Sequence, residues 1–279
     1  MACPSPPFGS VLGLRAERAL FADLYKNPKT WSLPPECSLP SSGMNSSSNN
    51  DKLAVLIDAD NAQASLINEL LAEVSQLGTA TVKRAYGDWT TPNLKGWKDV
   101  LHTQAIQPVQ QFSYTTGKNS TDSALIIEAM DLLHTGRVHG FCLVSSDSDF
   151  TRLATRIRES GLVVYGFGER KTPQAFVAAC DKFLFTEILS PEQVPTPVSG
   201  GEDLEPLMRQ AVAALAKDDG WAALSAVGSM IGKNNPSFDP RNYGCQKLGE
   251  LVRKQSYLEV KKEPMGEGSN ASFLHVRIR

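Results

Sequence analysis

Short apolar runs and helical stripes alternate along the middle of the chain. Residues 53–59, LAVLIDA, form a nearly continuous apolar run. The apolar residues from Leu66 to Leu77 then recur at helical spacing, up to Gly78. A short apolar run followed by a stripe of helical period predicts a buried strand and then an amphipathic helix.

The same alternation continues to about Leu189. Further strands are predicted over TATVKRAYG, QPVQQF, GFCLVSS, LVVYGFG and FLFTEIL, and helices over LKGWKDVLHTQA, TDSALIIEAMDLLHTG, DFTRLATRIRESG and TPQAFVAAC. This order is typical of parallel strands joined by right-handed crossover helices, which cover both faces of the sheet. The predicted fold class is α/β, with a three-layer α/β/α domain and a central parallel sheet over residues 53–190.

The segments on either side of this domain have a different composition. Residues 1–52 are rich in Pro, Ser and Asn, and we expect them to be poorly structured. Met44 directly precedes a short polar lead into the first strand, so one hypothesis places the start of translation there. Mass spectrometry of the native N-terminus would test it. Residues 191–202 are rich in Pro, Gly and Ser and are predicted to be a linker.

A second, smaller domain is predicted over residues 203–279. Apolar residues from Leu204 to Leu215 recur at helical spacing, and GWAALSAVGSMIGKNNP and RNYGCQKLGELVRKQ predict two more helices. The tail alternates apolar and polar residues on both sides of a Gly-rich turn, which predicts a hairpin. Three helices and a hairpin make a small winged helix.

Composition and charge narrow the class of protein. A net charge of −2 and a pI near 6.1 give no general attraction to polyanions, so any contact with nucleic acid must come from local patches. The five cysteines are scattered, with no CxxC pair and no spacing suited to zinc, which favours reduced thiols. Without an apolar stretch of about 18 residues or a signal-peptide pattern, we expect a cytoplasmic protein that contacts no membrane.

Candidate chemistry lies where two predicted strands end. Asp58 and Asp60 follow the first strand, and Asp147 and Asp149 follow the fourth. Ligands of open parallel sheets bind beyond the carboxyl ends of the strands, so these acids are expected to share one cleft. Two unit charges ~4 Å apart repel by about 4 kcal/mol at an effective dielectric of ~20. A divalent cation would relieve this repulsion, and oxygen ligands favour Mg²⁺ or Mn²⁺.

Asp122 is expected to join the same cleft. It opens a predicted helix whose apolar stripe places it on or near the buried side of the helix start. An alternative is that Asp122 and Asp149 are helix N-caps, a role in which Asp is worth about 1 kcal/mol. Capping does not explain Asp58 or Asp147, which end apolar strands.

The segments IDADN, GKNSTDSALIIEAMD and VSSDSDF, in this order within residues 53–190, resemble the NYN domain of the PIN-like ribonuclease superfamily, in its LabA-like branch. The resemblance implies a PIN-like fold and metal-dependent hydrolysis of RNA phosphodiester bonds. The site residues that it implies are the core ligands Asp58, Asp122 and Asp147, the fourth acid Asp149, and Asn61 and Ser146, which would assist by hydrogen bonding.

The segments DGWAALSAVGSMI, NPSFDPRNYGCQKLGELV and YLEV resemble the OST-HTH/LOTUS domain, which implies binding of RNA and, in some members, of protein partners. Residues 203–279 hold 11 Lys and Arg against 9 Asp and Glu, whereas residues 53–190 hold 12 against 15. An ordinary solvated surface is the alternative to a patch that contacts RNA phosphates. The candidate phosphate contacts are Lys118, Lys247, Arg253, Lys254, Lys261 and Lys262, with Arg277 and Arg279 on the hairpin and Lys83 and Arg84 in the first domain. Trp221 and Tyr243 are expected to fill the small core instead.

Other functional classes fit the pattern less well. A haloacid-dehalogenase-type phosphatase also has DxD after its first strand, but DADNA does not continue as that family does. A Toprim-like site requires Glu after one strand, where this chain has Asp, and GFGERK is not a complete nucleotide-binding fingerprint. The main alternative to a ribonuclease is a non-catalytic RNA-binding regulator or protein-interaction adaptor that retains the acidic cleft.

Overall fold

The structure is a computed structural model that describes most of both predicted domains. Among the residues it describes, no helix combines the length and the apolar character needed to span a membrane. The expectations for residues 1–50, for Lys118 and for the linker at 191–202 lie outside the described residues. The described segments are 51–112, 120–189, 204–264 and 272–279.

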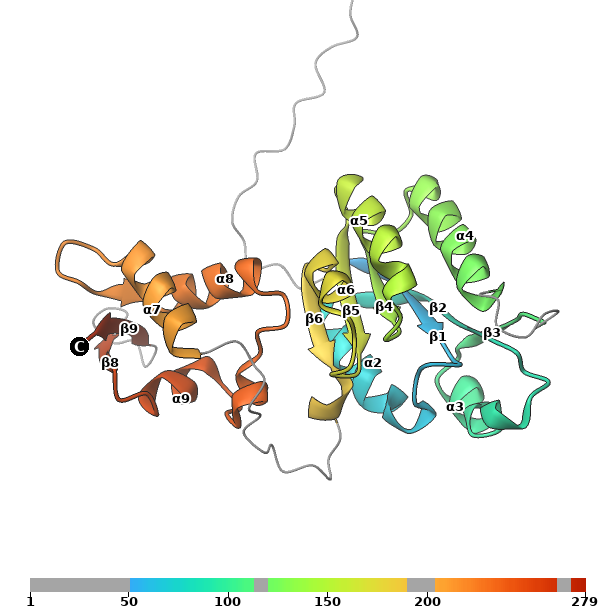
Figure 1. Cartoon of the computed structure of the whole chain (residues 1–279), viewed down its shortest axis with the longest axis horizontal. Helices are drawn as coiled ribbons and strands as arrows, with labels where there is room; N and C mark the ends of the chain where they lie inside the picture. Colours follow the sequence, from blue (N-terminus) through green and yellow to red (C-terminus); the bar gives the residue numbers. More distant parts are fainter. Residues whose placement is uncertain (1–50, 113–119, 190–203, 265–271) are drawn as a thin grey trace, which may run out of the picture. The chain divides into compact units, whose positions relative to one another are not determined.

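Six parallel strands form the sheet of the first domain, as predicted (Figure 1). Their order across the sheet is β3-β2-β1-β4-β5-β6, so β1 lies between β2 and β4. The strands are β1 (Lys52–Asp58), β2 (Thr79–Gly87), β3 (Gln107–Gln110), β4 (Gly140–Val144), β5 (Val163–Gly168) and β6 (Lys182–Phe185).

Helices cover both faces of this sheet and produce the predicted three layers. One face carries α2 (Ile67–Leu77) and α3 (Trp97–Thr103), and the other carries α4 (Ser120–Thr135), α5 (Thr151–Glu159) and α6 (Gln174–Ala179) (Figure 1). Short 3₁₀ turns connect several elements: η1 (Ala64–Leu66), η2 (Pro92–Leu94), η3 (Ser148–Phe150) and η4 (Thr186–Ile188).

The central position of β1 in the sheet explains why its sequence is almost entirely apolar. Successive side chains of a strand lie on opposite faces of the sheet. Ala54 and Leu56 therefore pack in the core under α4, α5 and α6, whereas Val55 and Ile57 pack in the core under α2 and α3. Both faces are covered, so an alternating polar pattern would leave buried polar groups.

The order of the strands changes direction at β1. From β1 the chain moves outward through β2 and β3, and it then returns to place β4 on the other side of β1. Ile57 pairs with Val144 at the carboxyl ends of these two strands. Open parallel sheets bind ligands beside such a reversal, because the loops leave in opposite directions and open a crevice between them.

The C-terminal domain has its own hydrophobic core. A three-stranded antiparallel sheet in the order β7-β9-β8 packs with three α-helices, which is the predicted winged-helix arrangement. The elements are α7 (Leu204–Leu215), β7 (Ala222–Ala223), α8 (Leu224–Asn234), η5 (Pro240–Tyr243), α9 (Leu248–Arg253), β8 (Leu258–Pro264) and β9 (Ser272–Ile278).

The third helix of this domain is shorter than the sequence pattern predicts. Asp239 accepts a hydrogen bond from the backbone N–H of Arg241 and caps the 3₁₀ turn η5. Gly244 then adopts a φ of 72°, which ends this turn and is accessible to glycine without strain. The helix α9 begins only at Leu248, so the expected single helix is a turn followed by a helix.

Candidate metal centre

Asp58 is the buried member of the candidate site. It ends β1, has 1% of its surface exposed, and its Oδ2 accepts hydrogen bonds from Asn61 Nδ2 at 2.7 Å and Ser145 Oγ at 2.8 Å. Its Oδ1 is also buried and has no hydrogen-bond partner among the described residues. Burial raises the pKa of this carboxyl group, although the two hydrogen bonds oppose the shift. A cation would satisfy Oδ1 and stabilise the charged form.

The local backbone brings Asn61 back to Asp58. The carbonyl of Asp58 accepts a hydrogen bond from the N–H of Ala62 at 2.9 Å, which makes a tight turn directly after β1. The short Asn61 side chain can therefore reach the carboxylate three residues earlier. Asn61 therefore contacts Asp58, and the assisting role that the sequence resemblance implies for it stays a prediction.

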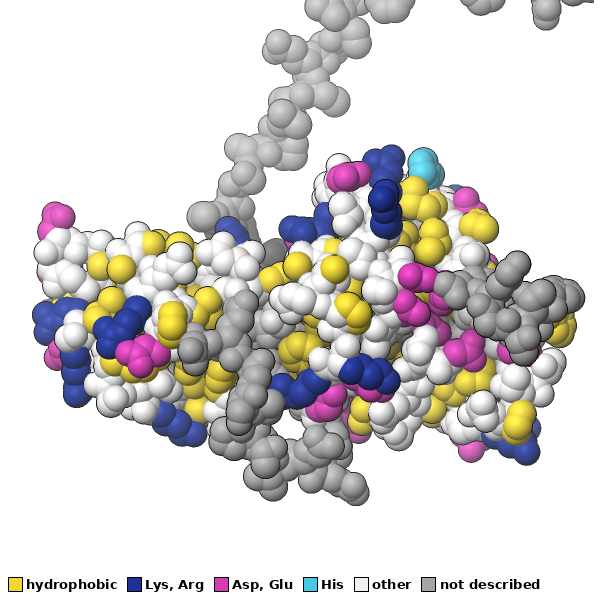
Figure 2. Space-filling view, in the orientation of Figure 1, with side chains coloured by type: hydrophobic (Ala, Val, Ile, Leu, Met, Phe, Trp, Pro, Cys, Tyr) yellow, Lys and Arg dark blue, Asp and Glu magenta, His cyan; other side chains and the backbone are white. Residues whose placement is uncertain are grey.

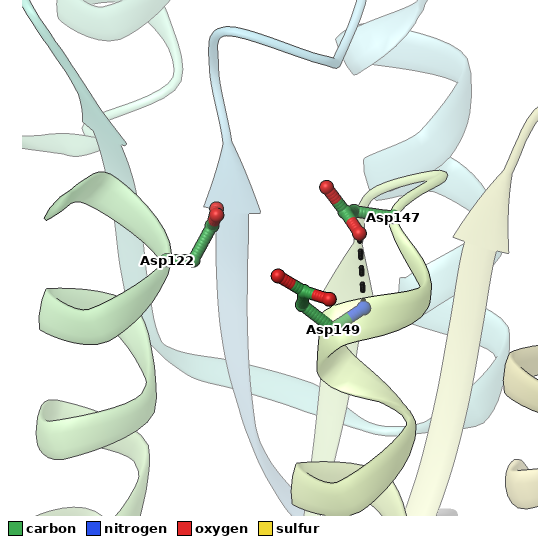
Figure 3. Close-up of side chains that lie close together, drawn as sticks. All are labelled: Asp122, Asp147 and Asp149. Atoms are coloured by element: carbon green, nitrogen blue, oxygen red, sulfur yellow. Dashed lines mark hydrogen bonds between the residues drawn. The ribbon is translucent and has the colours of Figure 1, made fainter. Parts of the chain in front are cut away.

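Three further aspartates converge at the same edge of the sheet. Asp122 lies in the first turn of α4, Asp147 follows β4, and Asp149 lies in η3. One carboxylate oxygen of each lies within 4.8 Å of those of the other two (Figure 3). Segments far apart in the sequence thus supply one compact group of acids.

The charges of the group act most strongly on Asp122. Partial burial and then the nearby charges of Asp58, Asp147, Asp149 and Asp60 raise the pKa of Asp122 to about 6. Figure 2 shows acidic side chains gathered between the starts of α4 and α5. Asp122 is therefore close enough to the other four aspartates to be affected by their charges, although only three of the five form the compact group.

These acids fit a divalent cation that prefers oxygen ligands. Mg²⁺ binds oxygen at about 2.0–2.1 Å, so opposite ligands in an octahedral shell are about 4 Å apart. The oxygens of Asp122, Asp147 and Asp149 already lie within 4.8 Å of one another. The unpaired Oδ1 of Asp58 is a further donor at the same strand ends. The donor set is all carboxylate, which suits Mg²⁺ or Mn²⁺.

The capping alternative applies to a different aspartate from those expected. Asp122 is the third residue of α4 and Asp149 lies inside η3, so neither precedes its helix. Asp147 is the N-cap instead, because its Oδ1 accepts a hydrogen bond from the N–H of Asp149 at 2.9 Å. This bond occupies one oxygen of Asp147 and fixes the orientation of the side chain toward Asp122 (Figure 3).

The hydroxyl that contacts Asp58 belongs to Ser145 and not to Ser146, the residue expected to assist. Ser146 Oγ accepts a hydrogen bond from the N–H of Glu169 at 2.8 Å and so holds the loop after β5. Ser145 Oγ donates to Asp58 and also accepts from the N–H of Asp147 at 3.1 Å. The pairing of β1 with β4 explains this, because Ser145 and Asp58 directly follow the paired residues Val144 and Ile57.

Two residues outside the expected ligand set also belong to this edge. Thr121 Oγ1 donates a hydrogen bond to Asp60 Oδ2 at 3.2 Å and ties the turn after β1 to the start of α4. Asp60 belongs to the acidic cluster that the sequence predicts, whereas Thr121 does not. The only signal for Thr121 is its position directly before Asp122 in a helix that must approach β1.

The basic residues expected to contact RNA differ in their surroundings. Arg84 pairs with Glu128 at 2.6 Å, and Lys83 donates to the carbonyl of Gln104, so both are occupied within the first domain. In the C-terminal domain, the exposed candidates lie at the ends of α9 and on β8. They are Lys247, Arg253, Lys254, Lys261 and Lys262.

Trp221 lies under basic side chains and is not part of the small core. Arg277 lies 4.8 Å and Lys261 5.9 Å from the centre of its ring. Arg277 also pairs with Glu259, and Lys261 with Glu263. Tyr243 packs against the core of the domain, as expected.

Comparison with known families assigns both parts of the chain. The family model of the NYN domain matches residues 52–189, and that of the OST-HTH/LOTUS domain matches residues 202–269. Among curated proteins, none matches the chain.

Several solved structures are similar to parts of the chain. A protein of unknown function from Vibrio parahaemolyticus is 21% identical over 49% of this chain and 93% of its own, with a TM-score of 0.42. A fragment of a protein from Chromobacterium violaceum is 38% identical over 30% of this chain and 88% of its own, with a TM-score of 0.23. An uncharacterized protein from Nitrosomonas europaea is 28% identical over 32% and 87%, with a TM-score of 0.26.

Proposed function

The chain joins an NYN domain of the PIN-like class to an OST-HTH/LOTUS domain, and on this premise we propose that it is a metal-dependent ribonuclease. The observation that carries the proposal is the group of Asp122, Asp147 and Asp149 at the same edge of the sheet as the unpaired, buried Oδ1 of Asp58. PIN-like nucleases generally depend on divalent metal ions, and this donor set suits Mg²⁺ or Mn²⁺.

Each residue of the site has a distinct part in this proposal. Asp122, Asp147 and Asp149 would hold the ion, and the buried Oδ1 of Asp58 would be a further ligand. Asn61 and Ser145 hold Oδ2 of Asp58, which leaves Oδ1 as the ligand atom. When bound, the ion supplies a reactive hydroxide and neutralises charge on the phosphate.

The reaction is the addition of water to phosphorus and the rupture of one bond from phosphorus to a ribose oxygen. The products are a phosphate monoester and a free hydroxyl group. The protein contributes position and charge, since the site has carboxylates fixed by burial and by hydrogen bonds but needs no nucleophilic side chain.

The C-terminal domain is proposed to bind the RNA that the first domain cuts. OST-HTH/LOTUS domains bind RNA, and this one presents exposed basic side chains at both ends of α9 and on β8. Phosphate contacts of this kind increase affinity without dictating sequence. Partner proteins that dock on the same domain remain the alternative role for it.

Cleavage assays on single-stranded, hairpin and G-rich RNAs, with Mg²⁺ or Mn²⁺, test the proposal. We expect cleavage that requires the metal, stops in chelator and disappears in Asp122→Asn. Asp131→Asn is the matched control, because Asp131 is an exposed acid of the same helix outside the cluster. Complete absence of cleavage on every RNA, with RNA binding intact, would favour a non-catalytic RNA-binding regulator.

A further inference from the structure

An open groove lies beside α3 in the first domain, on the far side of β2 from β1. It has a volume of about 610 Å³, within the ~300–1,000 Å³ typical of ligand pockets. Its walls are apolar, and its rim is basic: Trp89, Leu94, Leu101, Ile106 and Pro108 line it together with Thr91, Lys95, Lys98 and His102.

Two basic residues of the rim, Lys98 and His102, lie in α3, and Lys95 lies in the turn just before it. Lys95, Lys98 and His102 are spaced by three and four residues, which places them on one face of a helical segment about 10 Å long. All three are exposed, and neither lysine forms an ion pair within the described segments. Asp99, the one acid of α3, is not among the residues that line the groove.

The apolar wall of the groove is held rigidly. Trp89 donates from Nε1 to the carbonyl of Val109 at 3.0 Å, and its ring packs edge-on against Trp97. Gln110 accepts from the N–H of Trp89 and donates to Asp88, so β3 fixes the turn that carries the tryptophan. A rigid aromatic wall loses little entropy when a planar group stacks on it.

The groove adjoins the acidic cluster through Gly87. A Cβ at Gly87 would lie 2.7 Å from Leu94 Cδ1 and 3.4 Å from Asp60 Oδ1. Because Gly87 has no side chain, Asp60 of the acidic cluster and Leu94 of the groove both lie next to its Cα. The residues that line the groove extend from Trp89 and Thr91, which follow β2, to Ile106 and Pro108 at the start of β3.

We infer that this groove binds the single-stranded part of the RNA substrate next to the bond that is cut, an inference that rests on the proposed function. Lys95 and Lys98 contact phosphates, and unstacked bases contact the apolar wall. A duplex hides the faces of its bases, so the apolar wall is useful only for a single strand. The basic rim favours a polyanion over an apolar peptide.

Two double variants of the full-length protein test this assignment. Lys95→Glu with Lys98→Glu reverses the charge of the rim, whereas Lys52→Glu with Arg137→Glu makes the same change at the amino edge of the sheet, where both residues are also exposed. The probe is an unstructured 4-thiouridine RNA of about 20 nucleotides, bound in chelator so that cleavage is absent. Affinity is measured over a range of salt concentrations, and crosslinked peptides are identified by mass spectrometry.

We expect crosslinks within residues 89–108 of the wild type. The rim variant should bind about tenfold more weakly, should lose these crosslinks, and its log–log salt slope should be smaller by about 1.4, the value for two single-strand phosphate contacts. The amino-edge variant should bind like the wild type. Equal losses of affinity in both variants would overturn the inference, and so would crosslinks confined to residues 204–279. Unchanged RNA binding by the rim variant would also overturn it and would indicate a groove that binds protein.

The binding assay does not depend on catalysis. A wild type that crosslinks through the groove but cuts no RNA with metal would refute the proposed ribonuclease and keep the groove. A wild type that cuts RNA, with a rim variant that binds normally, would refute the groove alone.

Discussion

The acids of the first domain and the basic residues of the second are charged groups held in opposite ways. Asp58 is fully buried, has two specific hydrogen-bond donors, and lies at the end of a central strand. Lys247, Arg253 and Lys262 are exposed on the surface of a small domain. The hydrogen bonds and burial of Asp58 fix the orientation of its carboxylate, whereas the exposed basic side chains fix only the approximate position of a charge.

The difference matches what the proposed task of each domain requires. Ligands of a metal ion must sit at defined distances, so they need a sheet and a core to hold them. Attraction to phosphates falls off gradually with distance and tolerates mobile side chains. Substitutions in the acidic site should therefore produce large, local losses, whereas those in the basic region should produce small, distributed ones.

The largest expected effect is the loss of hydrolysis when a ligand acid is neutralised. Asp58→Asn, Asp122→Asn and Asp147→Asn each preserve volume and remove a charge that the ion requires, so activity should fall by roughly 10²–10³-fold or more. RNA binding by the C-terminal domain should persist in a gel-shift assay. An Asp58→Asn protein with full metal-dependent activity would refute the site.

Removal of the C-terminal domain should have the next largest effect. A chain that ends at residue 203 should still cut short single-stranded RNA but should bind long or structured RNA about tenfold more weakly at ~0.15 M salt, with a smaller salt slope. Filter binding over a salt series measures both quantities. Unchanged affinity and slope would identify this domain as a protein-contact module.

A pair of adjacent serines provides a finer comparison within the acidic site. Ser145→Ala removes a donor from Asp58 and should weaken metal affinity and hydrolysis by about tenfold, since partners of ligands commonly contribute this much. Ser146→Ala removes only a contact to the loop after β5 and should leave both near wild type. Metal titrations of the two variants, side by side, measure the difference.

The smallest expected effect is a pH dependence of stability in metal-free protein. The folded pKa of Asp122 is about 6 and lies above its ordinary value, so the folded chain retains a proton that the unfolded chain has released. Stability should therefore fall as pH rises from about 4 to about 6 and then level off. Partial exposure limits the loss to about 1 kcal/mol.

Denaturant unfolding at several pH values measures this slope. Asp122→Asn should flatten it, and Asp131→Asn should not. Saturating Mg²⁺ should also remove it, because bound metal displaces the proton. A slope that is identical in Asp122→Asn and wild type would assign the titration to another group.

Much of the architecture was predictable because burial imposes simple patterns. The apolar runs of β1 and β4 and the stripe of α4 define a covered parallel sheet, and the two domain families expected from the motifs are confirmed. Short-range backbone chemistry was less predictable. The turn at Pro240–Tyr243 depends on the Asp239 cap and on Gly244. A hydrophobic pattern read over about fifteen residues does not detect such single-residue signals.

The parts of the site that escaped prediction depend on strand register. Ser145 and Ser146 are adjacent and identical, so the sequence alone does not distinguish them. The pairing of Ile57 with Val144 decides which hydroxyl contacts Asp58. The contact between Thr121 and Asp60 likewise requires the three-dimensional approach of α4 to β1. Which residues carry charge could be read from the sequence, but which neighbours orient them could not.

The position of Asp58 at the end of the first strand and of Asp147 beyond the fourth also has a consequence during synthesis. During synthesis Asp58 emerges from the ribosome early, and the other acids emerge much later. Strand β1 cannot pair with β4 until β4 has also emerged. A nascent chain therefore has scattered carboxylates but no assembled centre. The acidic centre of this domain therefore forms only after the whole sheet has folded.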